Sequence, residues 1–179
     1  HFFDPPRGGK RPAVIFYMDG IGIRPALGEM AGRVAEAGYY VLLPNLYYRS
    51  GPIKPFEPAM GFKEGPERDR MMPMFKSINN TRVMEDTARF IAFLDSQPNT
   101  AGQKIGCVGY CMGGAFSLSA AGTYPDRVAV AESGIAAVDD AERAAEAGAD
   151  AVLVGSALSR SAAPGALVAA IAGVRRRGR

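Results

Sequence analysis

Three continuous apolar runs in the first two thirds of the chain have the length of buried strands. They are PAVIFYM at 12–18, YYVLLP at 39–44 and KIGCVGY at 104–110. Between them, apolar residues recur at helical spacing, which predicts one helix from Pro25 to just before Gly38 and another over 80–96. Strand and helix therefore alternate. This pattern predicts an α/β fold, a parallel sheet with helices on both faces.

Residues 45–70 form a long polar stretch that is rich in glycine and proline, and we predict a loop there. A loop of this length in a compact domain is often functional. At its start, Tyr47, Tyr48 and Arg49 either line a pocket or pack as ordinary loop residues, and the sequence leaves both interpretations open.

The last third keeps the strand and helix alternation but changes its composition. No aromatic residue follows Tyr124, and the segment after residue 130 is rich in alanine. The pattern predicts a βαβα tail, with strands at 128–132 and 149–155 and helices at 139–147 and 164–174. The change favours a seam near 127–131 between a part spanning 1–128 and a part spanning 129–179; the alternative is an alanine-rich edge of one domain. In either case, we expect the tail strands to extend one edge of a single parallel sheet.

Composition and charge narrow the classes of partner. The net charge is only +3, and no basic face interleaved with aromatic residues appears, so we expect no nucleic-acid binding. No apolar run reaches membrane length, so we expect no membrane partner. Two cysteines four residues apart predict a reducing, cytoplasmic setting, and the single histidine, His1, leaves too few ligands for a zinc site. We predict no cofactor and no metal, and a chain starting HFFDPP without methionine predicts a fragment or a processed protein.

The sequence GYCMGG at 109–114 carries the most specific chemical signal. A strand precedes it and a small-residue helix, predicted to reach Gly122, follows it. Glycines two positions before and after Cys111 let the strand and helix approach closely, so that the thiol projects from the sheet edge. The helix N-terminus favours the thiolate. Cys111 is therefore a candidate nucleophile, against the alternative of a buried cysteine in a packing turn; Cys107, inside the apolar strand, is predicted to be inert.

Residues 11–128 resemble the dienelactone hydrolase family of α/β-hydrolases. The resemblance rests on RPAVIFYMDGIG, GYYVLLPNLYYRSGP and KIGCVGYCMGG, in that order. It implies a hydrolase of carboxylic esters or lactones in which Cys111 is the nucleophile. The amides of Met112 and Gly20 would form the oxyanion hole, and Asp19 falls where the family often has a glutamate that contacts the resting thiol.

Two further positions of this resemblance are less specific. Arg68 falls near a family arginine that binds a substrate carboxylate. This alignment crosses a variable loop, so we favour the alternative that Arg68 is a solvated surface charge. The family's aspartate and histidine are expected after residue 128, and this part of the chain supplies no histidine. The resemblance thus predicts an incomplete α/β-hydrolase core with impaired turnover. Asp19 or Glu132 could act as a poor base, or each is an ordinary loop carboxylate.

The tail resembles the end of a second family, indole-3-glycerol-phosphate synthase, a (β/α)8 barrel. The matching stretches are ESGI at 132–135 and ADAVLVGSAL at 149–158. This resemblance implies a phosphate site built by Ser133, Gly134, Gly155 and Ser156, against the favoured alternative that these are ordinary turn residues after strands. The chain would then be a chimera of natural, engineered or artefactual origin.

Three functions follow from the sequence. The first is an impaired cysteine hydrolase of a small ester or lactone, the second a phosphate-binding or lyase remnant, and the third a non-catalytic α/β domain. The sequence leaves the substrate and the oligomeric state open.

Overall fold

The computed structural model describes residues 1–5, 9–52, 54–57, 63–128, 131–132, 137–146, 152–153, 158 and 161–175. Its main sheet has four strands in the order β1-β3-β2-β4. They are β1 (Phe2–Phe3), β3 (Tyr40–Leu42), β2 (Arg11–Tyr17) and β4 (Thr100–Gly109). The central strand β2 runs parallel to both β3 and β4, as expected, whereas β1 pairs antiparallel with β3. The sheet is therefore mixed, with an antiparallel strand at one edge.

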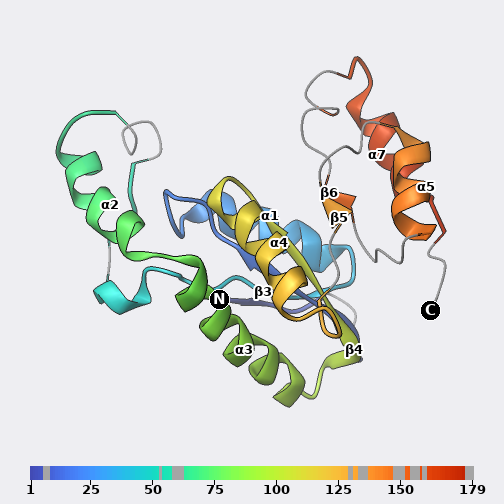
Figure 1. Cartoon of the computed structure of the whole chain (residues 1–179), viewed down its shortest axis with the longest axis horizontal. Helices are drawn as coiled ribbons and strands as arrows, with labels where there is room; N and C mark the ends of the chain where they lie inside the picture. The colour runs from blue at the N-terminus through green and yellow to red at the C-terminus, as the bar shows by residue number, and fades with distance from the viewer. Residues whose placement is uncertain are drawn as a thin grey trace.

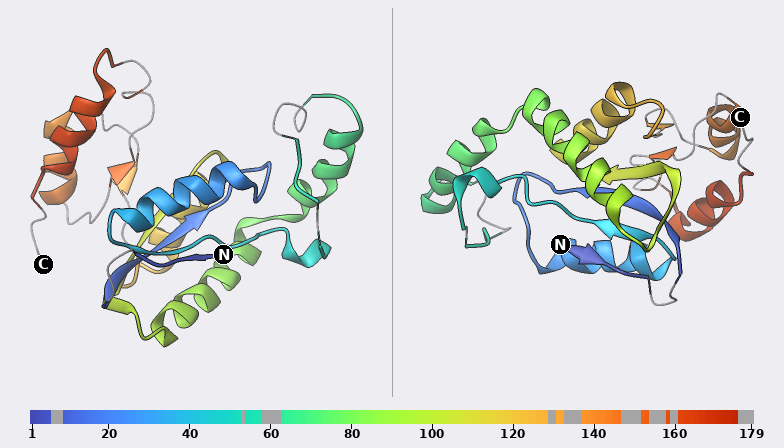
Figure 2. Two further views of the ribbon diagram at one scale, coloured as in Figure 1. Left: turned by 180° about the vertical axis from the view of Figure 1, so that it is seen from behind. Right: turned by 90° about the horizontal axis from the view of Figure 1, so that it is seen from below.

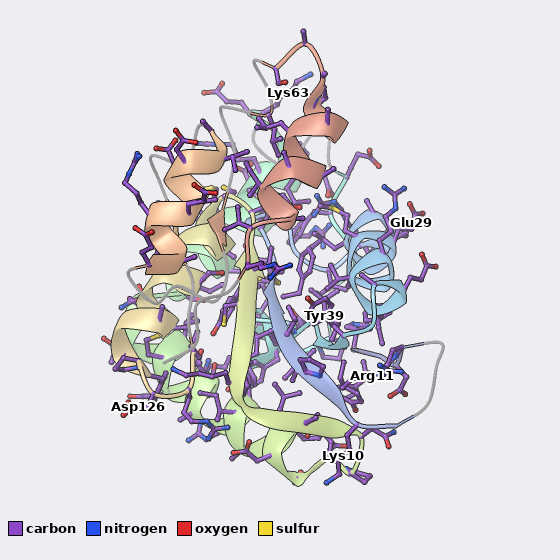
Figure 3. All side chains as sticks on the ribbon, turned by 90° about the vertical axis from the view of Figure 1, so that its right-hand side faces the viewer. Lys10, Arg11, Glu29, Tyr39, Lys63 and Asp126 are labelled. Atoms are coloured by element: carbon purple, nitrogen blue, oxygen red, sulfur yellow. The ribbon has the colours of Figure 1, made fainter. Side chains whose placement is uncertain are left out.

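Helices cover both faces of this sheet, which confirms the predicted fold class. Helix α1 (Pro25–Glu36) links β2 to β3, and α3 (Asn80–Ser96) and α4 (Met112–Thr123) flank β4 in the chain. The crossovers from β2 to β3 and from β3 to β4 run in opposite directions along the sheet, and right-handed crossovers of this kind put their helices on opposite faces. Figure 2 shows α1 on one side of the sheet and α4 on the other. In Figure 3, Glu29 of α1 and Asp126, which follows α4, lie on opposite sides of β2 and β4.

The core is built around β2, whose Ile15, Phe16 and Tyr17 are buried. Because this strand is covered on both faces, its sequence is an almost continuous run of apolar residues. The buried Tyr17 hydroxyl is satisfied, since it lies 2.7 Å from the Thr87 hydroxyl on α3. Thr87 in turn donates to the Val83 carbonyl oxygen.

The polar stretch at 45–70 is only partly a loop. It contains a short 3-10 helix, η1 (Tyr48–Ser50), and the start of α2 (Pro66–Ser77). The loop prediction is wrong at Pro66, because a proline at the first helical position is compatible with a helix. Asp86 on α3 anchors η1 by accepting two hydrogen bonds from the Arg49 guanidinium, at 2.7 and 2.8 Å. Figure 1 shows α2 at the end of the molecule away from the tail.

The described part of the tail forms helices and short strands within the predicted ranges, and its first residue lies beside the main sheet. Val128 makes a parallel bridge with Ile105 of β4. Beyond it, β5 (Ala131–Glu132) pairs in parallel with β6 (Val152–Leu153) as a two-stranded sheet, and the continuation of one parallel sheet through the tail stays a prediction. Helices α5 (Val138–Glu146) and α7 (Pro164–Ala172) lie beside this pair (Figure 1). The described tail strands are two residues long, with Ala131 opposite Val152 and Glu132 opposite Leu153.

Candidate active site

Cys111 occupies a strained turn between β4 and α4. Its backbone has φ 56° and ψ −122°, and among the described residues it is the one non-glycine residue with positive φ. A side chain in this region of φ and ψ is costly, and such strain is concentrated at functional sites. The cysteine is exposed, so the turn presents its thiol to solvent.

Two glycines make this turn possible by removing side chains where backbones meet. A Cβ on Gly109 would lie 2.2 Å from the carbonyl oxygen of Gly113, and a Cβ on Gly113 would lie 2.5 Å from the carbonyl oxygen of Tyr17. Neither contact is possible between real atoms. The glycine spacing that the sequence singled out is therefore required by packing, and it brings the start of α4 against the end of β2.

The N-terminus of α4 begins directly after the cysteine. The first N–H groups of any helix lack acceptors within the helix. Gly113 N–H instead donates to the Tyr110 carbonyl oxygen at 2.9 Å, and Gly114 N–H to that of Cys111 at 3.1 Å. Met112 is the first helical residue, so its N–H is the donor that follows the thiol. This N–H is the group that the family resemblance assigns to the oxyanion hole.

The loop after β2 carries Gly20 and is held by Asp19. The carboxylate of Asp19 forms a bidentate ion pair with the guanidinium of Arg24, with N···O distances of 2.8 and 2.7 Å. It also accepts the Ile21 N–H at 3.0 Å, while the Asp19 carbonyl oxygen accepts the Gly22 N–H at 3.1 Å. Through these bonds Asp19 holds the backbone of the loop in place. Its predicted contact with the resting thiol stays a prediction.

Tyr47 is the residue at this site to which the sequence analysis gave no definite role. Its hydroxyl donates to the Gly20 carbonyl oxygen at 2.6 Å. Its pKa is raised by burial, and the negative charges of Asp19 and Cys111 raise it further. Tyr47 thus lies close enough to both groups to feel their charge. One feature of the sequence indicates that Tyr47 belongs to this site. Tyr47 follows the YYVLLP strand, and the carboxyl ends of parallel strands lie at the same edge of a sheet.

The other cysteine is sequestered. Cys107 is buried in β4, and burial raises the pKa of its thiol to about 12, so it is protonated at neutral pH. A protonated, buried thiol is a poor nucleophile. The chain therefore has one exposed cysteine, in the turn, and one buried and protonated cysteine, in the strand.

No histidine is placed beside Cys111. The single histidine, His1, precedes β1, and its carbonyl oxygen accepts the Leu43 N–H. Strand β1 is three strand spacings from β4, roughly 14 Å across the sheet. Among the described residues, no group of three or more histidine, cysteine or acidic side chains is arranged to hold a metal ion.

Of the remaining candidate residues, two lie in the described part of the chain and four lie outside it. Arg68 is half-buried on α2, and no hydrogen bond or ion pair within the described part of the chain joins it to Cys111. Its substrate role stays a prediction. Glu132 lies in β5. The four predicted phosphate-site residues, Ser133, Gly134, Gly155 and Ser156, lie outside the described residues.

Comparison with known proteins decides the ancestry of this site. The sequence model of the dienelactone hydrolase family matches residues 2–158. The chain belongs to the dienelactone hydrolase family. Its match runs past residues 127–131, where the composition changes, so the family covers part of the tail as well. The tail's resemblance to indole-3-glycerol-phosphate synthase and the chimera that it implies stay predictions.

The curated relatives include two carboxymethylenebutenolidases. That of Pseudomonas sp. (strain P51) is 30% identical over 116 residues, which cover 65% of this chain and 47% of the relative. That of Rhodococcus opacus is 26% identical over 121 residues, which cover 67% of this chain and 42% of the relative. The chain thus spans about half the length of the curated relatives that it matches.

Solved structures of the dienelactone hydrolase family share the fold. A putative dienelactone hydrolase from Klebsiella pneumoniae aligns with a TM-score of 0.57 at 20% identity, over 72% of this chain and 50% of that one. A dienelactone hydrolase-like promiscuous phosphotriesterase from metagenomic libraries aligns with a TM-score of 0.54 at 22% identity, over 73% of this chain and 50% of that one.

No helix within the described residues is both long and apolar enough to cross a membrane.

Proposed function

We propose that this chain is a cysteine hydrolase of a small carboxylic ester or lactone that forms an acyl-enzyme readily and releases it slowly. The observation that carries the proposal is the exposed Cys111 on its strained turn, with φ 56°. Backbone strain of this kind is concentrated at functional sites, and the thiolate of such a cysteine is the nucleophilic form.

The acylation step uses residues of this turn and the loop after β2. The Cys111 thiolate attacks the carbonyl carbon, a C–S bond forms, and the carbonyl π electrons move to oxygen. The N–H groups of Met112 and Gly20 stabilise this oxyanion by hydrogen bonding. Collapse restores the carbonyl, breaks the C–O bond to the leaving alkoxide, which takes a proton from solvent, and leaves a thioester on Cys111.

Deacylation is the weak step in this proposal. A water molecule must attack the thioester, and a general base speeds this attack by accepting a proton from the water. His1 lies at the far edge of the sheet, and Asp19 is engaged by Arg24, so neither supports such a role. We therefore expect the thioester to accumulate.

A stopped-flow experiment with p-nitrophenyl acetate tests the proposal. We expect one equivalent of p-nitrophenol in a burst, followed by slow turnover, and an acetyl adduct on Cys111 by mass spectrometry. Cys111→Ala should abolish the burst, whereas Cys107→Ala, which removes the buried thiol, should retain it. A burst that survives Cys111→Ala would refute Cys111 as the nucleophile, and the absence of any burst would refute the proposal in favour of a non-catalytic α/β domain.

A further inference from the structure

Tyr47 is wedged beside the loop that carries Gly20. It is 3% exposed, and its ring packs edge-on against Phe56, with centroids 6.3 Å apart and planes at 83°. On another side the ring fills the space that a side chain on Gly22 would need, since a Cβ there would lie 3.1 Å from Tyr47 Cε2. The ring is therefore fixed by close packing, and it directs its hydroxyl to one acceptor.

That acceptor is the peptide oxygen of the proposed oxyanion loop. The Tyr47 hydroxyl donates to the Gly20 carbonyl oxygen at 2.6 Å, in a buried hydrogen bond. The N–H of the same peptide unit, that of Ile21, donates to the Asp19 carboxylate. The preceding peptide is held by the bond from Gly22 N–H to the Asp19 carbonyl oxygen. Both peptide planes that flank the Gly20 α-carbon are thus pinned.

Pinning these planes sets the direction of the Gly20 N–H. The N–H and C=O of a trans peptide point in opposite directions, so fixing the Asp19 carbonyl oxygen also fixes the Gly20 N–H. A glycine would otherwise be free to rotate here, because it has no Cβ to limit φ and ψ. A donor contributes most to an oxyanion hole when it needs no reorganisation as charge develops.

We infer that Tyr47 is the positioning residue of the oxyanion loop, holding the Gly20–Ile21 peptide through its hydroxyl so that the Gly20 N–H keeps its direction during acylation. This inference rests on the proposed function. It deepens that function by adding a residue that contacts neither the substrate nor the sulfur.

The local charges keep this donor intact. Burial and the negative charges of Asp19 and Cys111 raise the pKa of Tyr47 above its ordinary value. The phenol therefore stays protonated over the pH range in which a cysteine thiolate forms, and the hydrogen bond to Gly20 persists when Cys111 is reactive.

The test separates oxyanion stabilisation from thiol reactivity by comparing two reagents. Acylation by p-nitrophenyl acetate develops charge on a carbonyl oxygen, whereas alkylation by iodoacetamide displaces iodide at carbon and needs no oxyanion hole. We expect Tyr47→Phe to slow the acylation burst roughly tenfold, as loss of one well-placed hydrogen bond would. Alkylation of Cys111 should stay within about twofold of the wild-type rate, since both reagents use the same thiolate.

Tyr48→Phe is the matched control, because the Tyr48 hydroxyl bonds to Asp86 and not to the Gly20 loop. It should leave both rates unchanged. Equal slowing of acylation and alkylation by Tyr47→Phe would show that Tyr47 acts on the thiol or on the fold as a whole. No slowing of acylation would also overturn the inference.

A second measurement does not depend on catalysis. In isotope-labelled protein, Tyr47→Phe should shift the Gly20 carbonyl carbon resonance and lower the order parameters of the Gly20 and Ile21 amides, whereas Tyr48→Phe should do neither. Unchanged Gly20 signals would refute the positioning role even in a protein without turnover. Absence of a Cys111-dependent burst in the wild type, with Gly20 shifted in the variant, would instead refute the hydrolase proposal alone.

Discussion

Gly109 and Gly113 meet backbone to backbone, so that a Cβ on Gly109 would lie 2.2 Å from both the carbonyl carbon and the carbonyl oxygen of Gly113. Peptide groups cannot give way as a flexible side chain can. We expect Gly109→Ala to lower the free energy of unfolding by about 3 kcal/mol, the upper part of the usual range for overpacking. Urea unfolding followed by circular dichroism measures this change.

Gly122 is the matched control in α4. A Cβ at Gly122 meets no atom within 4 Å. Alanine also restricts the unfolded chain and favours helix, so Gly122→Ala should stabilise the protein by about 0.5–1 kcal/mol. Effects of the same sign and size at both positions would contradict the close approach at the turn.

The strain at Cys111 can be measured by substitution. Its φ of 56° and ψ of −122° suit glycine and disfavour any residue with a Cβ. Cys111→Gly should therefore be more stable than Cys111→Ala by about 1 kcal/mol, although glycine in an ordinary helix or strand is the less stable of the two. Thermal and urea unfolding of the two variants provide the comparison, and a more stable alanine variant would show that the turn is unstrained.

The buried carboxylate of Asp86 should depend strongly on Arg49. The side chain of Asp86 is only 3% exposed, and Arg49 is the partner that binds both of its oxygens. Arg49→Met leaves this buried charge with the weaker bonds from Tyr48 and Arg89, and we expect a loss of about 3 kcal/mol.

The surface pair of Arg127 and Asp95 is the matched comparison for this measurement. It has the same two-pronged geometry, but its aspartate side chain is 48% exposed. Exposed pairs contribute little, so Arg127→Met should cost under about 1 kcal/mol. If urea unfolding gave equal losses for the two variants, the anchoring role of Asp86 for η1 would be wrong.

Cys107 should make stability fall with rising pH. Its pKa is raised from 9.0 to about 12 by burial, so the unfolded thiol ionises between pH 9 and 12 while the folded thiol keeps its proton. The native state then binds more protons than the unfolded state, and stability declines as pH rises through this window. We expect Cys107 to account for a loss of about 1 kcal/mol between pH 9 and 10.

Urea unfolding at pH 8, 9 and 10 in a reducing buffer measures this dependence. Cys107→Ala should be less stable at pH 8, because it removes a buried side chain, but its decline between pH 9 and 10 should be smaller by that amount. Identical slopes in the wild type and in Cys107→Ala would mean that Cys107 is accessible to water.

The local elements of the hydrolase part could be read from the sequence because their signals are local. Apolar runs and helical periodicity located β2, α1 and α3, since burial on one or both faces repeats with the geometry of the element, and the GYCMGG motif located the turn at Cys111. The glycines at 109 and 113 were identified from spacing alone. Their contacts agree with the reason given for that spacing, close packing of strand and helix.

Other features depend on contacts between distant segments, and only the tertiary structure decided them. The antiparallel β1, the pairing of β5 with β6, and the bond from Tyr47 to Gly20 join residues whose partners leave no periodic pattern in the chain. A strand edge can accept several partners of similar energy, and a tyrosine hydroxyl can reach many acceptors. Local patterns in the chain specify which segments form strands, helices and the cysteine turn, whereas the packing of distant segments selects the hydrogen-bond partners of each one.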